Sequence, residues 1–240
     1  MRLEHEILEL KTRYTFNIAR MKGDFARRTV HVRLIADDGM EGWGEAPVST
    51  PYYGETADTV AAVLPLLARA VEQGLEQGGT ADSLPIEAIE TAMNAAIGYN
   101  RGAKVAISSA LHDMQGKRAG QPVWRTWGLD PASAPRSSYT IGIDEPDVMR
   151  ERAREAAGFP NLKVKIGTAR DEEMLRAIRD AAPDASLKVD ANTAWTAEQA
   201  IERLPMLEEY RVELLEQPLH PEDLDGFARL RGRSRIPIYA

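Results

Sequence analysis

The second half of the chain alternates short apolar runs with amphipathic runs, and this alternation limits the folds that it can adopt. The apolar runs have the length of strands, and the amphipathic runs have apolar residues at three- and four-residue steps. The expected strands are 138–143, 161–166, 187–191, 212–216 and 236–240, and the expected helices are 145–157, 170–181, 197–207 and 222–230. Strict alternation of this kind predicts a parallel sheet, either doubly wound or closed into a barrel.

The start of the chain has a pattern of strands without intervening helices. Residues 3–10 and 28–36 alternate apolar and polar side chains, and a turn at 37–39 leads into a short return strand at 41–45. Alternation with a period of two around a Gly-bearing turn indicates a hairpin. The sequence therefore predicts a strand meander at the N-terminal end.

From about residue 56 to residue 128 the pattern is helical. One of the apolar stripes in this part consists of Val105, Leu111 and Met114. Such spacing predicts helices that each bury one face. We therefore expect an α+β domain over residues 1–128, followed by an α/β domain over residues 129–240.

The composition excludes several classes of site and favours others. The chain has no cysteine, which excludes disulfides, zinc-thiolate sites and a cysteine nucleophile. No apolar run reaches the roughly 18 residues of a membrane span, and the N-terminus lacks the apolar region of a secretory signal. The net charge of -7 comes without a basic run, so we expect no nucleic-acid partner. These features fit a cytoplasmic protein that does not bind membranes.

Polar residues stand at the carboxyl ends of the expected strands at a nearly constant interval. Thr140, Lys165, Asp190 and Glu216 follow one another at intervals of 25, 25 and 26 residues. In a (β/α)8 barrel the active site is built at this end of successive strands. A constant period therefore predicts that the four side chains face one barrel mouth.

Each of these residues also has an ordinary interpretation. Lys163 and Lys165 are two positions apart on one strand and share a face. They could instead be protective lysines on a solvent-facing edge strand. Asp190 alone could be a helix cap or a turn residue, and Glu216 before a Gln-Pro pair is a weak signal alone. Only the combination favours a site.

Together these residues suit proton abstraction beside a metal ion. Carboxylates on neighbouring strand ends are the ligands that Mg²⁺ prefers. A lysine near a cation and near a second lysine is expected to have a lowered pKa, because like charges disfavour its protonated form. Such a lysine can remove a proton α to a carboxylate, and the metal stabilises the enediolate that results.

Three motifs at this spacing resemble the enolase superfamily, specifically its muconate-lactonizing subgroup. They are Lys-x-Lys at 163–165, Val-Asp-Ala-Asn at 189–192 and Glu-Gln-Pro at 216–218. The sequence Gly-Trp-Gly-Glu-Ala-Pro at 42–47 resembles the capping domain of that subgroup. The resemblance covers the whole chain, and it implies an N-terminal capping domain followed by a (β/α)-barrel domain.

Within the subgroup, the chain is most similar to the dipeptide epimerases. This similarity rests on Tyr-Gly-Glu-Thr at 53–56 and on Ser-Tyr-Thr-Ile-Gly-Ile-Asp at 138–144. It implies an isomerase that depends on Mg²⁺ and epimerises a dipeptide. It implies Lys165 as an acid/base catalyst, Lys163, Thr140 and Arg20 as substrate-binding residues, and Asp190 and Glu216 as metal ligands.

The resemblance also implies parts that these 240 residues do not contain. In the family a third metal carboxylate, a second catalytic lysine and the residues that bind the dipeptide amino group lie further along the barrel. A full barrel takes roughly 250 residues, so we expect an incomplete barrel of about five strands, truncated and inactive as this chain alone. We expect such an open sheet to self-associate as a homo-oligomer or to need a complementing C-terminal fragment.

Other functions remain compatible with the same motifs. N-acylamino-acid racemases, o-succinylbenzoate synthases and muconate cycloisomerases share them, so the resemblance does not separate these activities from dipeptide epimerisation. A different class of alternative is a non-catalytic fragment that binds a complementary chain.

Overall fold

The computed structural model describes residues 1–23, 26–48, 50–79 and 83–240. Contacts between residues divide the chain into two compact units, and each unit is described by itself. The first unit consists of Met1–Thr12 and Ala26–Ala134, and the second of Arg13–Phe25 and Pro135–Ala240. The loop that begins at Arg13 is thus grouped with the second unit, although it follows the first strand of the chain.

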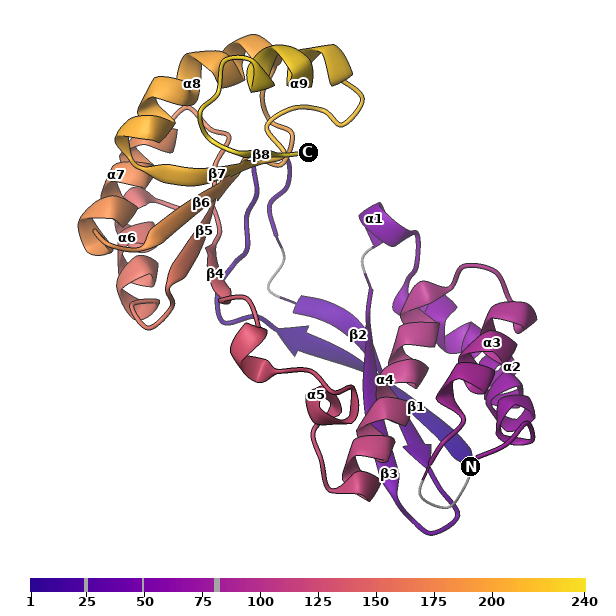
Figure 1. Cartoon of the computed structure of the whole chain (residues 1–240). Helices are drawn as coiled ribbons and strands as arrows, with labels where there is room; N and C mark the ends of the chain where they lie inside the picture. Colours follow the sequence, from indigo (N-terminus) through magenta and orange to yellow (C-terminus); the bar gives the residue numbers. More distant parts are fainter. Residues whose placement is uncertain (24–25, 49, 80–82) are drawn as a thin grey trace. The chain divides into compact units, whose positions relative to one another are not determined.

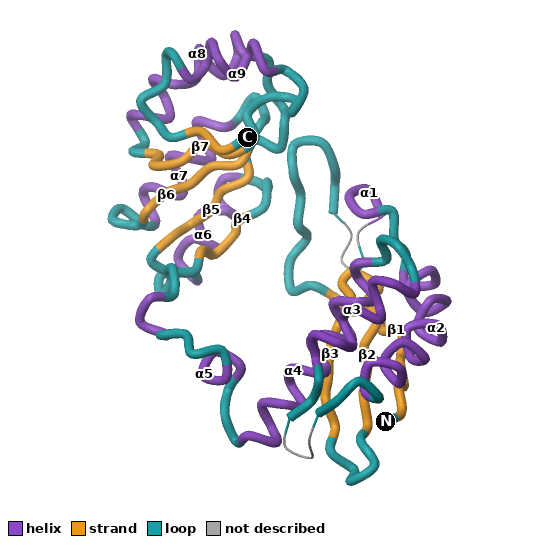
Figure 2. The backbone as a smooth tube through the Cα atoms, turned by 45° about the vertical axis from the view of Figure 1, so that its right-hand side comes forward, coloured by secondary structure: helices purple, strands orange, loops and turns teal. Residues whose placement is uncertain are grey.

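The first unit consists of an antiparallel meander and a set of helices (Figures 1 and 2). Its three strands are paired in the order β1-β2-β3, as the alternating sequence predicts. The strands are β1 (Arg2–Lys11), β2 (Ala26–Ile35) and β3 (Glu41–Pro47). The helices are α1 (Thr50–Tyr53), α2 (Ala57–Leu75), α3 (Ile86–Ala96), α4 (Arg101–Ala119) and α5 (Val123–Thr126), and a 3₁₀ turn follows at Pro131–Ser133.

The core of this unit lies between one face of the sheet and the helices. Val30, Val32 and Leu34 alternate along β2 and are fully buried, which confirms the predicted face of this strand. The apolar stripe predicted for α4 was wrong at Val105, whose side chain is 52% exposed. The buried face of α4 instead contains small residues such as Ala106, because this helix approaches the backbone of β3 closely.

Two glycines in β3 make that close approach possible. A Cβ atom on Gly44 would lie 1.9 Å from the carbonyl oxygen of Ala106, and one on Gly42 would lie 2.0 Å from that of Ala110. Both neighbours are backbone atoms, which cannot rotate out of the way. The close packing of α4 against β3 therefore requires glycine at positions 42 and 44.

We expect Gly44→Ala to lower the free energy of unfolding of the first unit by about 3 kcal/mol, because β3 must separate from α4. Urea unfolding followed by circular dichroism measures this loss. Gly98→Ala is the matched control, because a Cβ atom on Gly98 meets nothing within 4 Å. Equal stability of the two variants would contradict the close-packing explanation.

The second unit is the parallel α/β arrangement that the sequence predicts, with five strands in chain order (Figure 1). The strands are β4 (Ser138–Ile141), β5 (Asn161–Lys165), β6 (Ser186–Asp190), β7 (Val212–Glu216) and β8 (Ile238–Tyr239). The connecting helices are α6 (Pro146–Glu155), α7 (Asp171–Ala181), α8 (Ala197–Glu209) and α9 (Leu224–Arg231). Within the described residues the sheet is open, which agrees with the expected incomplete barrel. No helix of the described residues is both long enough and apolar enough to cross a membrane.

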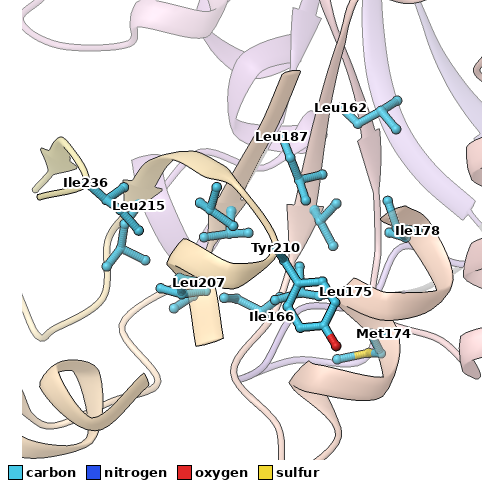
Figure 3. Close-up of a cluster of buried hydrophobic side chains, with 14 of the residues drawn as sticks. Leu162, Ile166, Met174, Leu175, Ile178, Leu187, Leu207, Tyr210, Leu215 and Ile236 are labelled. Carbon is cyan, nitrogen blue, oxygen red and sulfur yellow. The ribbon is translucent and has the colours of Figure 1, made fainter. Parts of the chain in front are cut away.

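Alternate residues of each strand bury one face of this sheet under the helices. Val164, Val189 and Leu215 are register partners on adjacent strands and are fully buried. Leu175, Ile178 and Leu207 contribute to the same cluster from the helices (Figure 3). Since strand side chains alternate between faces, the residues between these apolar positions point to the opposite face. That face carries the charged residues predicted for the site.

Candidate active site

The charged face of the second sheet contains two adjacent rows of side chains. Lys165, Asp190 and Glu216 are register partners on β5, β6 and β7 and form the row at the carboxyl ends of these strands. Thr140 pairs with Lys163 in the row one layer deeper. The equal spacing in sequence thus brings Thr140 to the predicted face, but two residues further down its strand.

Two lysines and two carboxylates form one network of ion pairs on this face. The Lys165 Nζ lies 2.5 Å from the Asp190 Oδ2. The Lys163 Nζ lies 3.3 Å from the same oxygen and 2.6 Å from the Glu216 Oε2. Because β5 pairs with both β4 and β6, the alternative of an edge strand with protective lysines is wrong.

The carboxylates control the protonation of Lys163. Burial alone would lower the pKa of Lys163, but the hydrogen bond to Glu216 and the charges of Glu216 and Asp190 together raise it above its ordinary value. With carboxylates as its neighbours, Lys163 favours its ammonium form. The lowered pKa that the sequence predicts applies to a lysine beside a bound divalent cation, and it stays a prediction.

The turns that follow β6 and β7 hold the carboxylates in place. The Asp190 Oδ1 accepts a hydrogen bond of 2.8 Å from the backbone N–H of Asn192, so the turn interpretation of Asp190 also holds for this oxygen. Asn192, Thr193 and Gln217 have positive φ angles of 47°, 63° and 44°. Such angles are uncommon outside glycine and concentrate at functional sites. The Thr193 N–H donates to the Gln217 carbonyl at 2.7 Å, which joins the two turns.

The donor set fits a hard divalent cation. The Asp190 Oδ2 and the Glu216 Oε2 both approach one positively charged group, the Lys163 ammonium, so the two oxygens converge on a common cation. The Asn192 Oδ1 is a third oxygen acceptor in the same turn, and it is buried without a hydrogen-bond partner among the described residues. Within the described part of the chain, no group of three or more His, Asp or Glu side chains is arranged so that it could hold a metal ion. Two carboxylates therefore make up the acidic part of this candidate site.

Arg20 lies apart from these charged groups. It is exposed, and it lines a cavity of about 630 Å³ between the loop at 17–22 and the turns that follow β4 and β5. The lining of this cavity contains none of the residues Lys163, Lys165, Asp190 and Glu216. The structure thus brings these four together and places Arg20 on a neighbouring cavity.

Phe16 is a site residue that the sequence analysis missed. Its ring centroid lies 5.8 Å from the Lys165 Nζ, within the range in which an aromatic face attracts an ammonium group. The residue stands in a loop without periodicity, so spacing gave no signal for it.

Asp171 holds the turn directly after the lysine strand. Its Oδ1 accepts hydrogen bonds from the N–H groups of Gly167 and Thr168, at 2.9 and 2.8 Å, and from the Thr168 hydroxyl at 3.1 Å. Its Oδ2 is buried and has no partner within the described residues. Burial raises the pKa of Asp171 above the ordinary value of 3.8, against the effect of the three hydrogen bonds.

This raised pKa gives a pH dependence with a definite sign. The folded chain binds a proton at Asp171 more tightly than the unfolded chain does, so this group makes the free energy of unfolding fall as the pH rises from 3.8 through the raised value. We expect Asp171→Asn to lack this fall and to stay within about 1 kcal/mol of the wild type at neutral pH, since its amide oxygen keeps the three contacts. Urea unfolding at a series of pH values tests this. Parallel pH profiles for the two proteins would contradict it.

Two family models match this chain, one in its N-terminal part and one in its C-terminal part. Residues 9–128 match the N-terminal domain of mandelate racemase and muconate lactonizing enzyme, and residues 148–240 match the enolase C-terminal domain-like family. The chain belongs to the mandelate racemase and muconate lactonizing enzyme family. This membership confirms the resemblance inferred from the Lys-x-Lys, Val-Asp-Ala-Asn and Glu-Gln-Pro motifs.

Several similar members of this family are epimerases. An L-Ala-D/L-Glu epimerase from Bacteroides thetaiotaomicron is 37% identical over 97% of this chain, which spans 58% of the length of that relative. A hydrophobic dipeptide epimerase from Roseobacter litoralis is 36% identical over the whole chain, which spans 68% of its length.

Solved structures give the same relationship. A dipeptide epimerase from Enterococcus faecalis in complex with Mg and the dipeptide L-Leu-L-Tyr superposes with a TM-score of 0.81 at 29% identity, over 98% of this chain and 66% of its own. A dipeptide epimerase from Cytophaga hutchinsonii in complex with Mg and D-Ala-L-Val has a TM-score of 0.80 at 32% identity, over 98% and 63%.

Proposed function

We propose that this chain carries part of the active site of a Mg²⁺-dependent dipeptide epimerase. The observation that carries the proposal is the convergence of Lys163, Lys165, Asp190 and Glu216 on one face of the sheet. Similar proteins that act on dipeptides and bind Mg support the same reaction class.

Each residue has a role that follows from its position. Lys165 is the group that takes or returns the α-proton of the C-terminal residue of the dipeptide. It is the last residue of β5, and its Nζ lies beside the proposed metal ligand Asp190. Lys163 and Thr140, in the deeper row, contact the substrate. Arg20, which lines the neighbouring cavity, would reach the substrate from the loop.

Asp190 and Glu216 would hold the metal ion. Bound Mg²⁺ supplies positive charge where negative charge builds on the substrate carboxylate. A cation at these two carboxylates would compete with the ammonium group of Lys163 for the Glu216 Oε2, which now lies 2.6 Å from that nitrogen. A lysine released from such an ion pair loses part of the attraction that raises its pKa.

Exchange of the α-proton tests this function directly. In D₂O with Mg²⁺, and in a protein whose barrel is completed C-terminal to these residues, we expect the α-proton of the C-terminal residue of L-Ala-L-Glu or L-Leu-L-Tyr to be replaced by deuterium, which proton NMR detects. An excess of chelator should stop the exchange. Exchange that persists with chelator, or that is absent from dipeptides and present with an N-acylamino acid, would contradict the proposal.

A further inference from the structure

The loop that carries Arg20 is tied to β4 through a residue that the proposed chemistry does not use. The Asn17 Nδ2 donates to the carbonyl oxygen of Ile143 at 3.1 Å, and the Ile143 N–H donates to the Asn17 carbonyl at 2.9 Å. Ile143 lies two residues beyond the end of β4. Asn17 therefore satisfies both backbone groups of the residue that continues this strand.

Asn17 also closes the loop on itself. Its Oδ1 accepts a hydrogen bond of 3.0 Å from the N–H of Gly23. Between these residues, Ile18 and Met21 exchange two backbone hydrogen bonds of 3.0 and 3.1 Å, which makes a tight turn. One side chain thus holds both the base of the loop and its attachment to the sheet.

Two glycines allow the loop to lie this close to the strand ends. A Cβ atom on Gly142 would lie 3.1 Å from the nitrogen of Asn17 and 3.2 Å from its oxygen. A Cβ atom on Gly167, at a φ of +117°, would lie 2.7 Å from the Cβ of Ala19. The loop is therefore packed against the backbone that follows β4 and β5.

The start of the loop has a separate anchor. Tyr14 donates a hydrogen bond to Glu155, and the guanidinium of Arg152 lies 4.8 Å from the centroid of the Tyr14 ring. Arg152 in turn pairs with Asp144 at 2.7 Å. Because these contacts do not involve Asn17, a change at Asn17 leaves this anchor intact.

We propose that Asn17 is a positioning residue that holds Phe16 against Lys165 and so controls the access of water and reagents to this lysine. Phe16 directly precedes Asn17, and its ring contacts the lysine on the side of the loop. Lys165 is 8% exposed, so a small outward displacement of the loop uncovers it. The inference rests on the proposed function, because Lys165 is the acid/base group there.

Chemical modification of Lys165 tests this role without requiring turnover. The full chain is treated with a water-soluble active ester, and mass spectrometry compares acylation of Lys165 with that of the exposed Lys11. We expect Asn17→Ala to raise the acylation rate of Lys165, relative to that of Lys11, about tenfold. A change of this size corresponds to the loss of one hydrogen bond. Thr15→Ala is the matched control. Thr15 is the other sequence neighbour of Phe16, and its side chain makes no hydrogen bond within the described residues. The Thr15→Ala change should therefore leave the acylation rate of Lys165 unchanged.

Two further variants keep the test decisive if Asn17→Ala does not fold. Asn17→Asp keeps the acceptor for Gly23 but loses the donor to Ile143, so it should behave like Asn17→Ala. Gly142→Ala places a methyl group between the end of β4 and the backbone of Asn17, so it should push the loop outward and also expose Lys165. Wild-type acylation in folded Asn17→Asp or Gly142→Ala would overturn the proposal.

The catalytic readout separates this inference from the proposed function. In protein that exchanges the α-proton, we expect Asn17→Ala to lower kcat about 100-fold, with KM within about threefold of the wild type. If Lys165→Ala retains full exchange, the proposed function fails regardless of Asn17. If Lys165→Ala abolishes exchange while Asn17→Ala changes neither acylation nor kcat, only the inference fails.

Discussion

In a protein whose barrel is completed C-terminal to these residues, replacing Lys165 by alanine is expected to lower the rate of α-proton exchange on a dipeptide by about 1,000-fold, the usual effect of removing a general acid or base. The reason is positional. Lys165 is at the end of β5, its Nζ lies 2.5 Å from Asp190, and its neighbours on the opposite face are buried apolar residues. Within the described residues, Lys163 is the other lysine in this network, and its hydrogen bond to Glu216 favours its charged form.

Proton NMR in D₂O measures this rate as the loss of the α-proton signal. Lys11→Ala is a suitable control, because Lys11 is exposed at the end of β1 in the first unit. It should leave the rate unchanged. An exchange rate in Lys165→Ala within a few-fold of the wild type would show that another group moves the proton.

Arg179→Ala is expected to lower the free energy of unfolding of the second unit by about 3 kcal/mol. The guanidinium of Arg179 donates to backbone carbonyls of the segment at 182–185 that follows α7, and to that of Tyr210, which directly follows α8. Its Nη1 lies 2.9 Å from the oxygen of Ala185, and its Nη2 lies 2.8 Å from the oxygen of Tyr210. Burial lowers the pKa of Arg179, yet an arginine stays charged at neutral pH and complements the negative ends of both helix dipoles.

Alanine at this position leaves these carbonyls without their donor, whereas lysine restores part of the charge but not the planar arrangement of donors. We therefore expect Arg179→Lys to be intermediate. Arg154→Ala is the control, since Arg154 makes an exposed i,i+3 pair with Glu151 at 3.1 Å, and such pairs contribute at most about 1 kcal/mol. Thermal or urea unfolding that ranks Arg154→Ala as the more damaging change would contradict this account.

The sequence predicted those features that depend on local periodicity. The alternation of strands and helices after residue 138 predicted a parallel sheet, and the structure has one, with its five strands in chain order. The faces of Lys163 and Lys165 follow from the period of two, and their approach to Asp190 and Glu216 follows from the common level of the strand ends. Family membership, inferred from three motifs together, is confirmed by the family models.

The remaining features depend on contacts that no period encodes. The strand register places Thr140 beside Lys163 and one layer below Lys165, although its spacing in sequence equals that of the others. Val105 fits a helical stripe but is exposed, because the packing of α4 is set by the glycines of β3. The contact of Phe16 with Lys165 depends on the attachment of a loop through Asn17, and this could not be predicted from the loop itself.

The central claim is that Asp190 and Glu216 form a site for a divalent cation beside the two lysines. Titration of the full chain with Mn²⁺, followed by electron paramagnetic resonance of the free ion, tests it most directly. The claim predicts one Mn²⁺ site, from which Mg²⁺ displaces the Mn²⁺ ion. The dissociation constant should be about 1 mM, because two carboxylates are a small ligand set. Both Asp190→Asn and Glu216→Gln should lose this site. Binding that is absent from the wild type, or that is equal in the wild type and both variants, would contradict the claim.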